Sequence, residues 1–226
     1  MKVAIVCAMQ QETAMLKDSM LGVKTREVAG IAFTHGKMSS HEIMLCISGV
    51  GKSNAAATTQ LAICEFAPDV LINIGLAGSC TAALPLGGAV VADHLVYHDI
   101  RGEFIAESPP GTSVFVPDGG LMALAQKACG DLGIVFVKGT VATGDAFIES
   151  SALRDDIVLR TNCACVEMEA AAVAHIAQKN NVRYVVVKIM SDNADEGAMD
   201  TFHESLPLGA YCNLSVGIIS EIVRNL

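Results

Sequence analysis

The stretch Tyr184–Met190, which reads YVVVKIM, decides the fold class of this chain. Its β-branched, mostly apolar run predicts a strand buried on both faces, as in a parallel sheet covered by helices. Ser191-Asp192 follows directly, so the strand delivers an aspartate to its carboxyl end, where open α/β sheets bind ligands. A carboxylate is costly to desolvate without a role or a partner. We therefore predict that Asp192 is a catalytic acid rather than a helix N-cap, the other common role of such a residue.

Strand-like and helix-like segments alternate along the rest of the chain. Strands are predicted at residues 2–8, 31–35, 42–47, 69–74, 89–98 and 134–143, and helices at residues 10–20, 53–66, 119–132, 151–160, 169–180 and 208–225. This alternation predicts an α/β fold, with helices on both sides of a sheet. No linker or internal repeat divides the chain, so we expect residues 1–226 to form a single domain.

The composition bears on possible partners. Apolar residues make up 52% of the 226 residues and charged residues only 17%, which predicts a homo-oligomer, at least a homodimer, with an apolar interface. The formal net charge is −9, and the basic residues are scattered. Because nucleic acids bind to clustered basic side chains, the sequence argues against a nucleic-acid partner.

The sequence has no feature typical of a secreted or membrane protein. The apolar segment Met1–Met9 is short and ends at Gln10–Glu12, and no run approaches about 18 uninterrupted apolar residues. Most of the eight cysteines lie in apolar runs, which is typical of reduced thiols in a cytoplasmic protein. The close pair in Cys163–Cys165 has neither redox nor zinc spacing. We therefore expect a cytoplasmic protein without a metal or a cofactor.

Small or acidic residues follow several of the predicted strands. In a sheet whose strands run mostly one way, such loops meet at one end, and their convergence is a stronger signal than any single loop. The segments are Ala8–Glu12, Ser48–Lys52, Gly75–Gly78, Thr143–Ile148, Glu167–Glu169 and Ser191-Asp192. The glycine-rich loops lack P-loop and Rossmann spacing, so they are predicted to be tight turns that let a flat ligand approach the backbone.

Together with Tyr97–Asp99, these segments resemble the 5'-methylthioadenosine/S-adenosylhomocysteine nucleosidases of the nucleoside phosphorylase/hydrolase superfamily. The most specific part is Val-Glu-Met-Glu at 166–169 combined with Ser-Asp-x-Ala-Asp at 191–195, and the fit is loosest at residues 100–115. The resemblance implies a three-layer α/β/α sandwich around a mixed, partly barrel-like central sheet. It also implies hydrolysis of the N9–C1' bond of an adenine nucleoside to adenine and a 5-substituted ribose, in methionine salvage and the methyl cycle.

The resemblance implies a role for each of three carboxylates. Asp192 corresponds to the acid that protonates adenine at N7. Glu12 corresponds to the base that positions the attacking water on the opposite face of the sugar, as in inverting glycosidases. Glu169 corresponds to the residue that binds the ribose hydroxyls. From the residues alone, Glu12 could instead complement a helix dipole, and Glu167 could serve only to order its loop.

The remaining implied contacts surround the sugar, the base and the 5' group. Met168 would pack on the sugar, Phe147 would stack on adenine, and the Ile148 backbone would contact the base edge. Phe202 would help to cover the 5' pocket together with residues of a neighbouring subunit. Both phenylalanines could equally be core residues, and His98 is expected to order a loop together with its neighbour. The further predicted substrate-binding residues are Met9, Val50, Ala77, Gly78, Glu167 and Ser191.

Three features depart from the family pattern. Lys188 stands where many members carry arginine, and lysine lacks the planar fork of that side chain. Leu76 replaces a small residue. Residues 100–105 lack the pattern that is usual in the family, and we expect Phe104 to take the place of an aromatic residue of that pattern. Since this segment borders the 5' pocket in the family, the sequence leaves the 5' substituent open.

Three other functions stay open from the sequence. A purine nucleoside phosphorylase of the same fold would need arginines for phosphate, which the loops at 10–12 and 75–79 lack. A futalosine-type nucleoside hydrolase shares the acid and the ribose glutamate, and the altered loop with Arg101 and Glu103 is compatible with it. A catalytically inactive nucleoside-binding domain is disfavoured, because all three carboxylates are present.

Overall fold

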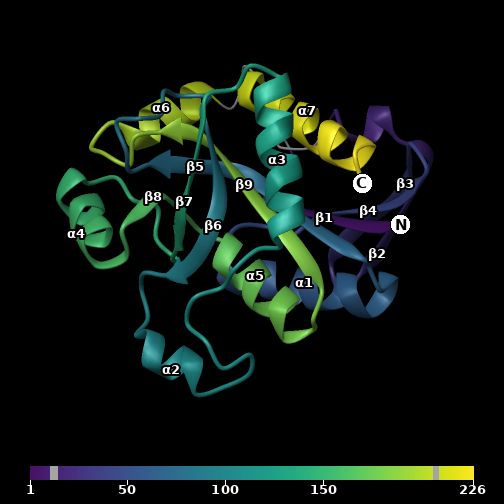
Figure 1. The fold of residues 1–226 in the computed structure, drawn as a ribbon, viewed down its shortest axis with the longest axis horizontal. Coiled ribbons are helices and arrows are strands. Elements are labelled where there is room, and N and C mark those ends of the chain that lie inside the picture. The colour runs from purple at the N-terminus through teal and green to yellow at the C-terminus, as the bar shows by residue number, and fades with distance from the viewer. Residues whose placement is uncertain (11–14, 206–208) are drawn as a thin grey trace.

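The structure is a computed structural model in which residues 1–10, 15–205 and 209–226 are described (Figure 1). Its strands are β1 (Lys2–Cys7), β2 (Leu21–Val28), β3 (Ile31–Met38), β4 (His41–Ile47), β5 (Val70–Ser79), β6 (Ala89–Tyr97), β7 (Phe136–Thr143), β8 (Cys163–Glu167) and β9 (Arg183–Asp192). Its helices are α1 (Lys52–Phe66), α2 (Gly102–Ala106), α3 (Gly119–Asp131), α4 (Ser151–Thr161), α5 (Ala170–Lys179), α6 (Ala198–Ser205) and α7 (Ala210–Arg224), with a 3-10 turn, η2, at Lys17–Ser19.

In the described part of the chain, the strands form one mixed sheet in the order β2-β3-β4-β1-β5-β8-β7-β6-β9. Strand β9 also pairs with β5, so that β5, β8, β7, β6 and β9 close into a ring. Strands β1, β4, β5 and β9 run parallel, whereas β6, β7 and β8 run the opposite way. This is the mixed, partly barrel-like sheet that the resemblance implies.

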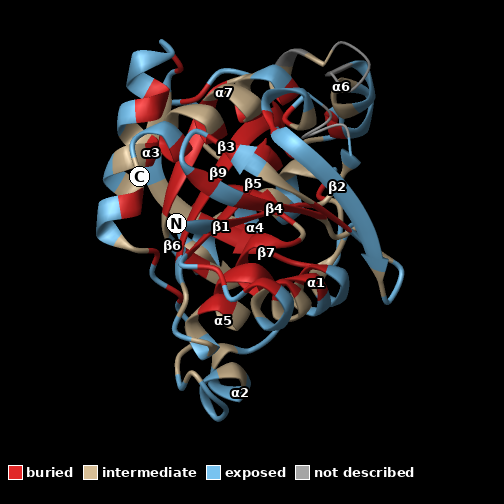
Figure 2. Ribbon diagram, turned by 90° about the vertical axis from the view of Figure 1, so that its right-hand side faces the viewer, coloured by how far each residue is buried: buried red, intermediate tan, exposed pale blue. Residues whose placement is uncertain are grey.

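Helices cover the sheet on two sides, which gives the expected three layers (Figure 1). One buried core packs β-strand residues against α3 and α7, and a second packs them against α1 and α5. Successive residues of β9 alternate between the cores, with Val187 in the first and Val186 in the second. The predicted strand is therefore buried on both faces, as its apolar run requires. Figure 2 shows the buried strands inside and β2 exposed along one edge.

Most of the predicted elements are present, with their ends shifted by a few residues. Residues 75–79, predicted as a loop, instead continue β5, because they pair with β9 and, at Gly78 and Ser79, with β8. The helix predicted at 10–20 is wrong over residues 15–20, which hold only a 3-10 turn at Lys17–Ser19, and residues 11–14 lie outside the described residues. No helix among the described residues has the length and apolar character needed to cross a bilayer.

The sequence did not predict β2, β8, α2 or α6. Residues Leu21 to Glu27 of β2 are all exposed, so this edge strand lacks the alternating apolar pattern that signals a strand. Strand β8 has only five residues, and its CACVE sequence has small residues rather than β-branched ones at most positions. Its assignment comes from pairing with β7 and β5, which is not visible in a local pattern.

Candidate active site

A cavity of about 290 Å³ lies where the carboxyl ends of β5, β8 and β9 meet. Strand β8 runs antiparallel to β5, and the two strands pair only near their carboxyl ends, at Gly78 with Val166 and Ser79 with Cys165. Both carboxyl ends therefore lie at the same cavity. The segments after β1, β4 and β7 reach the same cavity through Met9, Val50 and Ile148. The loops singled out in the sequence therefore surround a common space.

The cavity gathers all but one of the predicted site residues. Lining it are Met9, Val50, Ala77, Gly78, Phe147, Ile148, Glu167, Met168, Glu169, Ser191, Asp192 and Phe202. Glu12 lies outside the described residues. The lining also includes Ala8, Leu76, Ala146, Val166 and Met199, which were not predicted. Most of these are chain neighbours of predicted residues, whereas Met199 belongs to α6, an element that the sequence did not indicate.

Asp192 is the last residue of β9 and is only 2% exposed. One carboxylate oxygen, Oδ1, accepts a hydrogen bond from the Ala194 amide at 2.8 Å, and the other, Oδ2, lies 2.9 Å from the Ser191 hydroxyl. Burial raises the pKa of Asp192, and these two hydrogen bonds oppose the rise. A carboxyl group with a raised pKa keeps its proton at higher pH, which suits a general acid.

Gly78 of β5 gives Asp192 the space it occupies. A Cβ atom at position 78 would lie 2.8 Å from Oδ1 of Asp192 and 2.9 Å from the Ala194 Cβ. Any side chain there would displace the carboxylate. Gly78 thus lets the Asp192 carboxylate approach the β5 backbone closely. It does so within a strand and not in the predicted tight turn.

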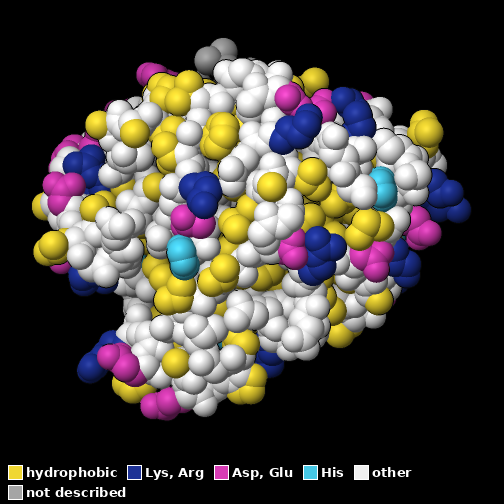
Figure 3. Space-filling model, in the orientation of Figure 1, with side chains coloured by type: hydrophobic (Ala, Val, Ile, Leu, Met, Phe, Trp, Pro, Cys, Tyr) yellow, Lys and Arg dark blue, Asp and Glu magenta, His cyan; other side chains and the backbone are white. Residues whose placement is uncertain are grey.

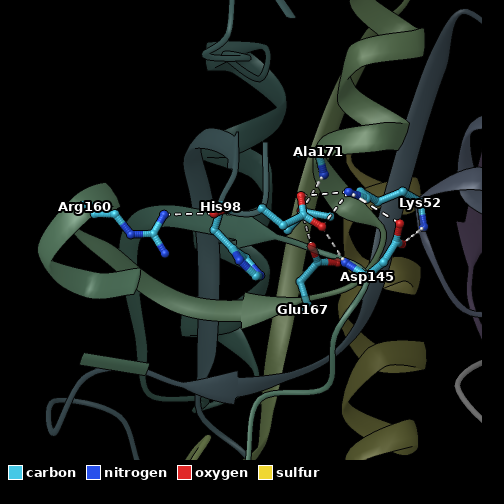
Figure 4. A network of polar contacts seen from close by, with 8 residues as sticks. Lys52, His98, Asp145, Arg160, Glu167 and Ala171 are labelled. Carbon is cyan, nitrogen blue, oxygen red and sulfur yellow. Dashed lines mark hydrogen bonds and ion pairs between the residues drawn. The ribbon is translucent and has the colours of Figure 1, made fainter. Parts of the chain in front are cut away.

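Glu167 ends β8 and has partners for both carboxylate oxygens. Its Oε2 lies 2.8 Å from the Lys188 ammonium, with both side chains 2% exposed, and accepts hydrogen bonds from the Glu169 and Ala170 amides at 3.0 and 2.8 Å. Its Oε1 accepts a hydrogen bond from the Thr143 hydroxyl (Figure 4). These contacts favour the interpretation that Glu167 orders its loop. Lys188, on β9, thus contacts Glu167 at the end of β8 and does not line the cavity.

Glu169 immediately precedes α5 and is 6% exposed. Its Oε1 accepts a hydrogen bond from the Gly51 amide at 2.8 Å. Gly51 has a φ of 98°, which favours glycine, and ends the loop between β4 and α1. This contact links the carboxylate implied in ribose binding to the loop that carries Val50.

Aromatic and aliphatic side chains line the rest of the cavity. Phe147 and Phe202 meet edge to face, with ring centroids 5.6 Å apart. Met168, Met199 and Leu76 add apolar surface. Such a lining suits a flat base and an apolar substituent. Among the described residues, no group of three or more His, Cys, Asp or Glu side chains is placed to hold a metal ion.

The model of the phosphorylase superfamily matches residues 2–211 of this chain. The chain belongs to the phosphorylase superfamily. Within it, a 5'-methylthioadenosine/S-adenosylhomocysteine nucleosidase from Shewanella piezotolerans is 36% identical over 225 residues, covering 96% of this chain and 97% of that protein. The chain is therefore also a member of this nucleosidase family, as the motifs of the sequence indicated.

Solved structures of superfamily members have the same fold. The nucleosidase from Neisseria meningitidis, in complex with methylthio-immucillin-A, has a TM-score of 0.94 at 32% identity, covering 100% of this chain and 99% of that chain. The futalosine hydrolase of Helicobacter pylori has a TM-score of 0.92 at 28% identity, covering 100% and 98%. The backbone alone thus does not distinguish these two hydrolases.

Proposed function

We propose that this protein hydrolyses the N-glycosidic bond of 5'-methylthioadenosine and S-adenosylhomocysteine, releasing adenine and the 5-thio-substituted ribose. The observation that carries the proposal is the cavity itself, in which the buried acid Asp192, the buried carboxylate Glu169 and the phenylalanine pair surround one space. The nucleosidase relatives, which match nearly the whole chain, support it. We take residues 1–226 as one nucleosidase domain that needs no cofactor.

In the proposed mechanism, Asp192 gives its proton to N7 of adenine. Protonation makes the base a better leaving group, and the raised pKa of Asp192 keeps the proton available. The neighbouring Ser191 hydroxyl, 2.9 Å from Asp192 Oδ2, holds the carboxyl group in place. Phe147 stacks on the base and the Ile148 backbone contacts its edge, both from the segment after β7.

The sugar is held by the segment that follows β8. Glu169 accepts hydrogen bonds from the ribose hydroxyls, since one carboxylate can accept from two donors. Met168 packs on the sugar. As the C1'–N9 bond breaks, C1' gains positive charge, and Glu12 directs a water molecule to the face opposite the leaving base.

The cavity favours hydrolysis over transfer to phosphate. The described residues that line the cavity include no lysine or arginine. The sequence of residues 11–14 and 206–208, which the structure does not describe, contains neither. A phosphate nucleophile needs positive charge or clustered donors to bind. Glu167, Glu169 and Asp192 instead place three acidic groups around the cavity.

A futalosine-type nucleoside hydrolase is the second candidate, because a futalosine hydrolase has nearly the same fold. The sequence feature compatible with it is Arg101, which could bind an anionic 5' substituent. In the structure the Arg101 side chain is 77% exposed, lies 3.6 Å from Glu103 and does not line the cavity. These contacts favour the thioether substrates.

We also propose that the protein acts as a homodimer in the cytoplasm. The dimer is supported by the low charged fraction of 17% and by two exposed apolar side chains beside and on α2, Ile100 and Phe104, which are 42% and 59% exposed. Figure 3 shows Lys and Arg side chains dispersed among acidic ones on one face, which does not suit a nucleic acid. Sedimentation of the purified protein tests the dimer.

The test of the proposed function is incubation with 5'-methylthioadenosine and with S-adenosylhomocysteine, each with and without phosphate. We expect free adenine and a free 5-thio-substituted ribose at equal rates in both buffers. Formation of a ribose-1-phosphate product only in phosphate buffer would show a phosphorylase. A carboxylated 5' analogue as the preferred substrate by kcat/KM would favour the futalosine-type hydrolase.

A further inference from the structure

A cluster of three charged side chains lies beside the cavity but does not line it. The Lys52 ammonium, at the start of α1, is 2.7 and 2.6 Å from the two carboxylate oxygens of Asp99 and 3.5 Å from Oδ2 of Asp145. The same ammonium lies 5.5 Å from the centroid of the Tyr97 ring, a cation–π contact. Figure 4 shows Lys52 and Asp145 side by side with dashed lines between them.

Backbone hydrogen bonds extend this cluster across three loops. The Lys52 amide donates to Oδ1 of Asp145 at 2.9 Å, and the Asp145 amide donates to Oδ2 of Asp99 at 2.9 Å. Lys52 follows the loop after β4, Asp99 follows β6 and Asp145 follows β7. Strands β6 and β7 already lie side by side, since Tyr97 pairs with Thr143 and the His98 amide donates to the Thr143 carbonyl at 2.9 Å. The contacts of Lys52 attach the segment after β4 to this pair.

Lys52 and Asp145 are each linked through the chain to a residue that contacts substrate in the proposed function. Gly51, next to Lys52, donates its amide to Glu169, the ribose carboxylate, at 2.8 Å. Asp145 is two residues before Phe147, which stacks on the base. A shift of Lys52 would therefore move both the sugar side and the base side of the cavity.

We propose that Lys52 is a positioning residue, whose ammonium holds the loops after β4, β6 and β7 at the spacing that adenine and ribose binding require. The inference rests on the proposed function for the identity of the ligand. Lys52 does not line the cavity, so it acts through Gly51 and Asp145 and not on the substrate itself.

The charges of the cluster make the inference specific. One ammonium lies between two carboxylates and offsets one of their two negative charges; the Asp99 and Asp145 side chains are 28% and 53% exposed and the Lys52 side chain is 21% exposed. Removing the ammonium leaves Asp99 and Asp145 as like charges that share a hydrogen bond between their loops. Their repulsion pushes the two loops apart. Replacing Asp99 by asparagine then removes one of the charges but keeps an oxygen that can accept from the Asp145 amide.

This reasoning predicts an unusual pattern in a double-mutant cycle. Lys52→Met should lower kcat/KM about tenfold, chiefly by raising KM, because small misplacements of binding groups have large effects. Lys52→Arg keeps the charge and should retain most of the activity. The double variant Lys52→Met/Asp99→Asn should be more active than Lys52→Met alone, since the unpaired charge is gone.

The experiment measures kcat and KM for adenine release, the Kd of free adenine by calorimetry, and Tm for each variant of the full chain. Lys127→Met is the matched control, because Lys127 pairs with Asp131 on α3 and does not line the cavity. We expect Lys52→Met to weaken adenine binding and raise KM, while Lys127→Met changes neither.

An unchanged KM and adenine Kd in Lys52→Met, with only a lower Tm, would overturn the inference, because Lys52 would then only stabilise the fold. Losses that simply add in Lys52→Met/Asp99→Asn would also overturn it. Wild-type protein that releases no adenine from either nucleoside contradicts the proposed function instead. In that case the adenine Kd of Lys52→Met against Lys127→Met still decides the inference.

Discussion

The carboxyl ends of β8 and β9 each present a buried acid to the same cavity, but the two acids have different partners. Glu167 is 7% exposed and Asp192 is 2% exposed. Glu167 lies 2.8 Å from the Lys188 ammonium. Asp192 accepts hydrogen bonds from Ser191 and Ala194, and within the described ranges it forms no ion pair with a lysine or an arginine.

Burial alone does not distinguish these two acids, but their partners do. A buried charge must be compensated, and the Lys188 ammonium with two backbone amides compensates Glu167. Asp192 has hydrogen bonds but no cationic partner among the described residues, and burial raises its pKa and favours the protonated form. This difference supports the proposed proton donation by Asp192 and a loop-ordering role for Glu167.

The largest expected effect is on turnover when the proton donor is removed. Asp192→Asn should lower kcat for adenine release by about 10²- to 10⁴-fold, the usual range for a general acid. Its Tm should stay the same or rise, because a buried carboxyl group without a cation is replaced by a neutral amide. Asp131→Asn is the matched control, since Asp131 pairs with Lys127 on α3 and does not line the cavity. A near-normal kcat in Asp192→Asn would show that Asp192 is not the proton donor.

The next effect is on stability at the other acid. Glu167→Gln leaves the Lys188 ammonium buried without its carboxylate, so the free energy of unfolding should fall by about 3–5 kcal/mol, measured by denaturant titration. The double variant Glu167→Gln/Lys188→Met removes both charges and should recover part of that loss. A double variant no more stable than Glu167→Gln would show that the ion pair is not what holds β8.

A smaller effect is expected at Glu169, on the same loop as Glu167. Glu169→Gln should lower kcat/KM about tenfold or somewhat more, because hydrogen bonds to a charged group contribute about 1.5–3 kcal/mol. A 2'-deoxy substrate lacks one of the hydroxyls and should lose much of its sensitivity to this change. If wild type and variant discriminate the deoxy analogue equally, Glu169 does not bind the ribose hydroxyls and its role is structural, as in its contact with Gly51.

The smallest effect is the pH dependence of stability. The pKa of Asp192 is raised in the folded state from an ordinary value of 3.8, so the folded protein binds this proton more tightly than the unfolded chain does. Wild type should therefore lose stability relative to Asp192→Asn as the pH rises from about that value through the folded pKa, and the difference should be constant above it. Thermal melts of both proteins across this range measure the difference in stability. A wild type that gains stability relative to Asp192→Asn as the pH rises would contradict the raised pKa.

The sequence predicted much of this arrangement because its signals were local. The apolar run of β9 and the acid that follows it indicated both a buried strand and a strand-end site. The closed ring could not be predicted, since it depends on β8, a short strand defined by its pairing with β5 and β7. The same limit applies to Lys188: its residue type was evident, but only the three-dimensional structure shows that this β9 side chain pairs with Glu167 at the end of β8.

Other parts of the site had no local signal. Met199 reaches the cavity from α6, which no pattern indicated, and Lys52 was noted only as part of a glycine loop. Its contacts with Asp99 and Asp145 join residues that are 47 and 93 positions apart, a distance over which sequence spacing predicts nothing.

The most direct test of the central claim is the ionisation state of Asp192 itself. Infrared difference spectra of wild type minus Asp192→Asn, with isotope-labelled aspartate, separate the carbonyl band of a protonated acid from the bands of a carboxylate. We predict a protonated-acid band for Asp192 that persists above pH 3.8, its ordinary pKa, and disappears only at higher pH. A band that is lost at or below that pH would contradict the account, because Asp192 would then not hold its proton above its ordinary pKa.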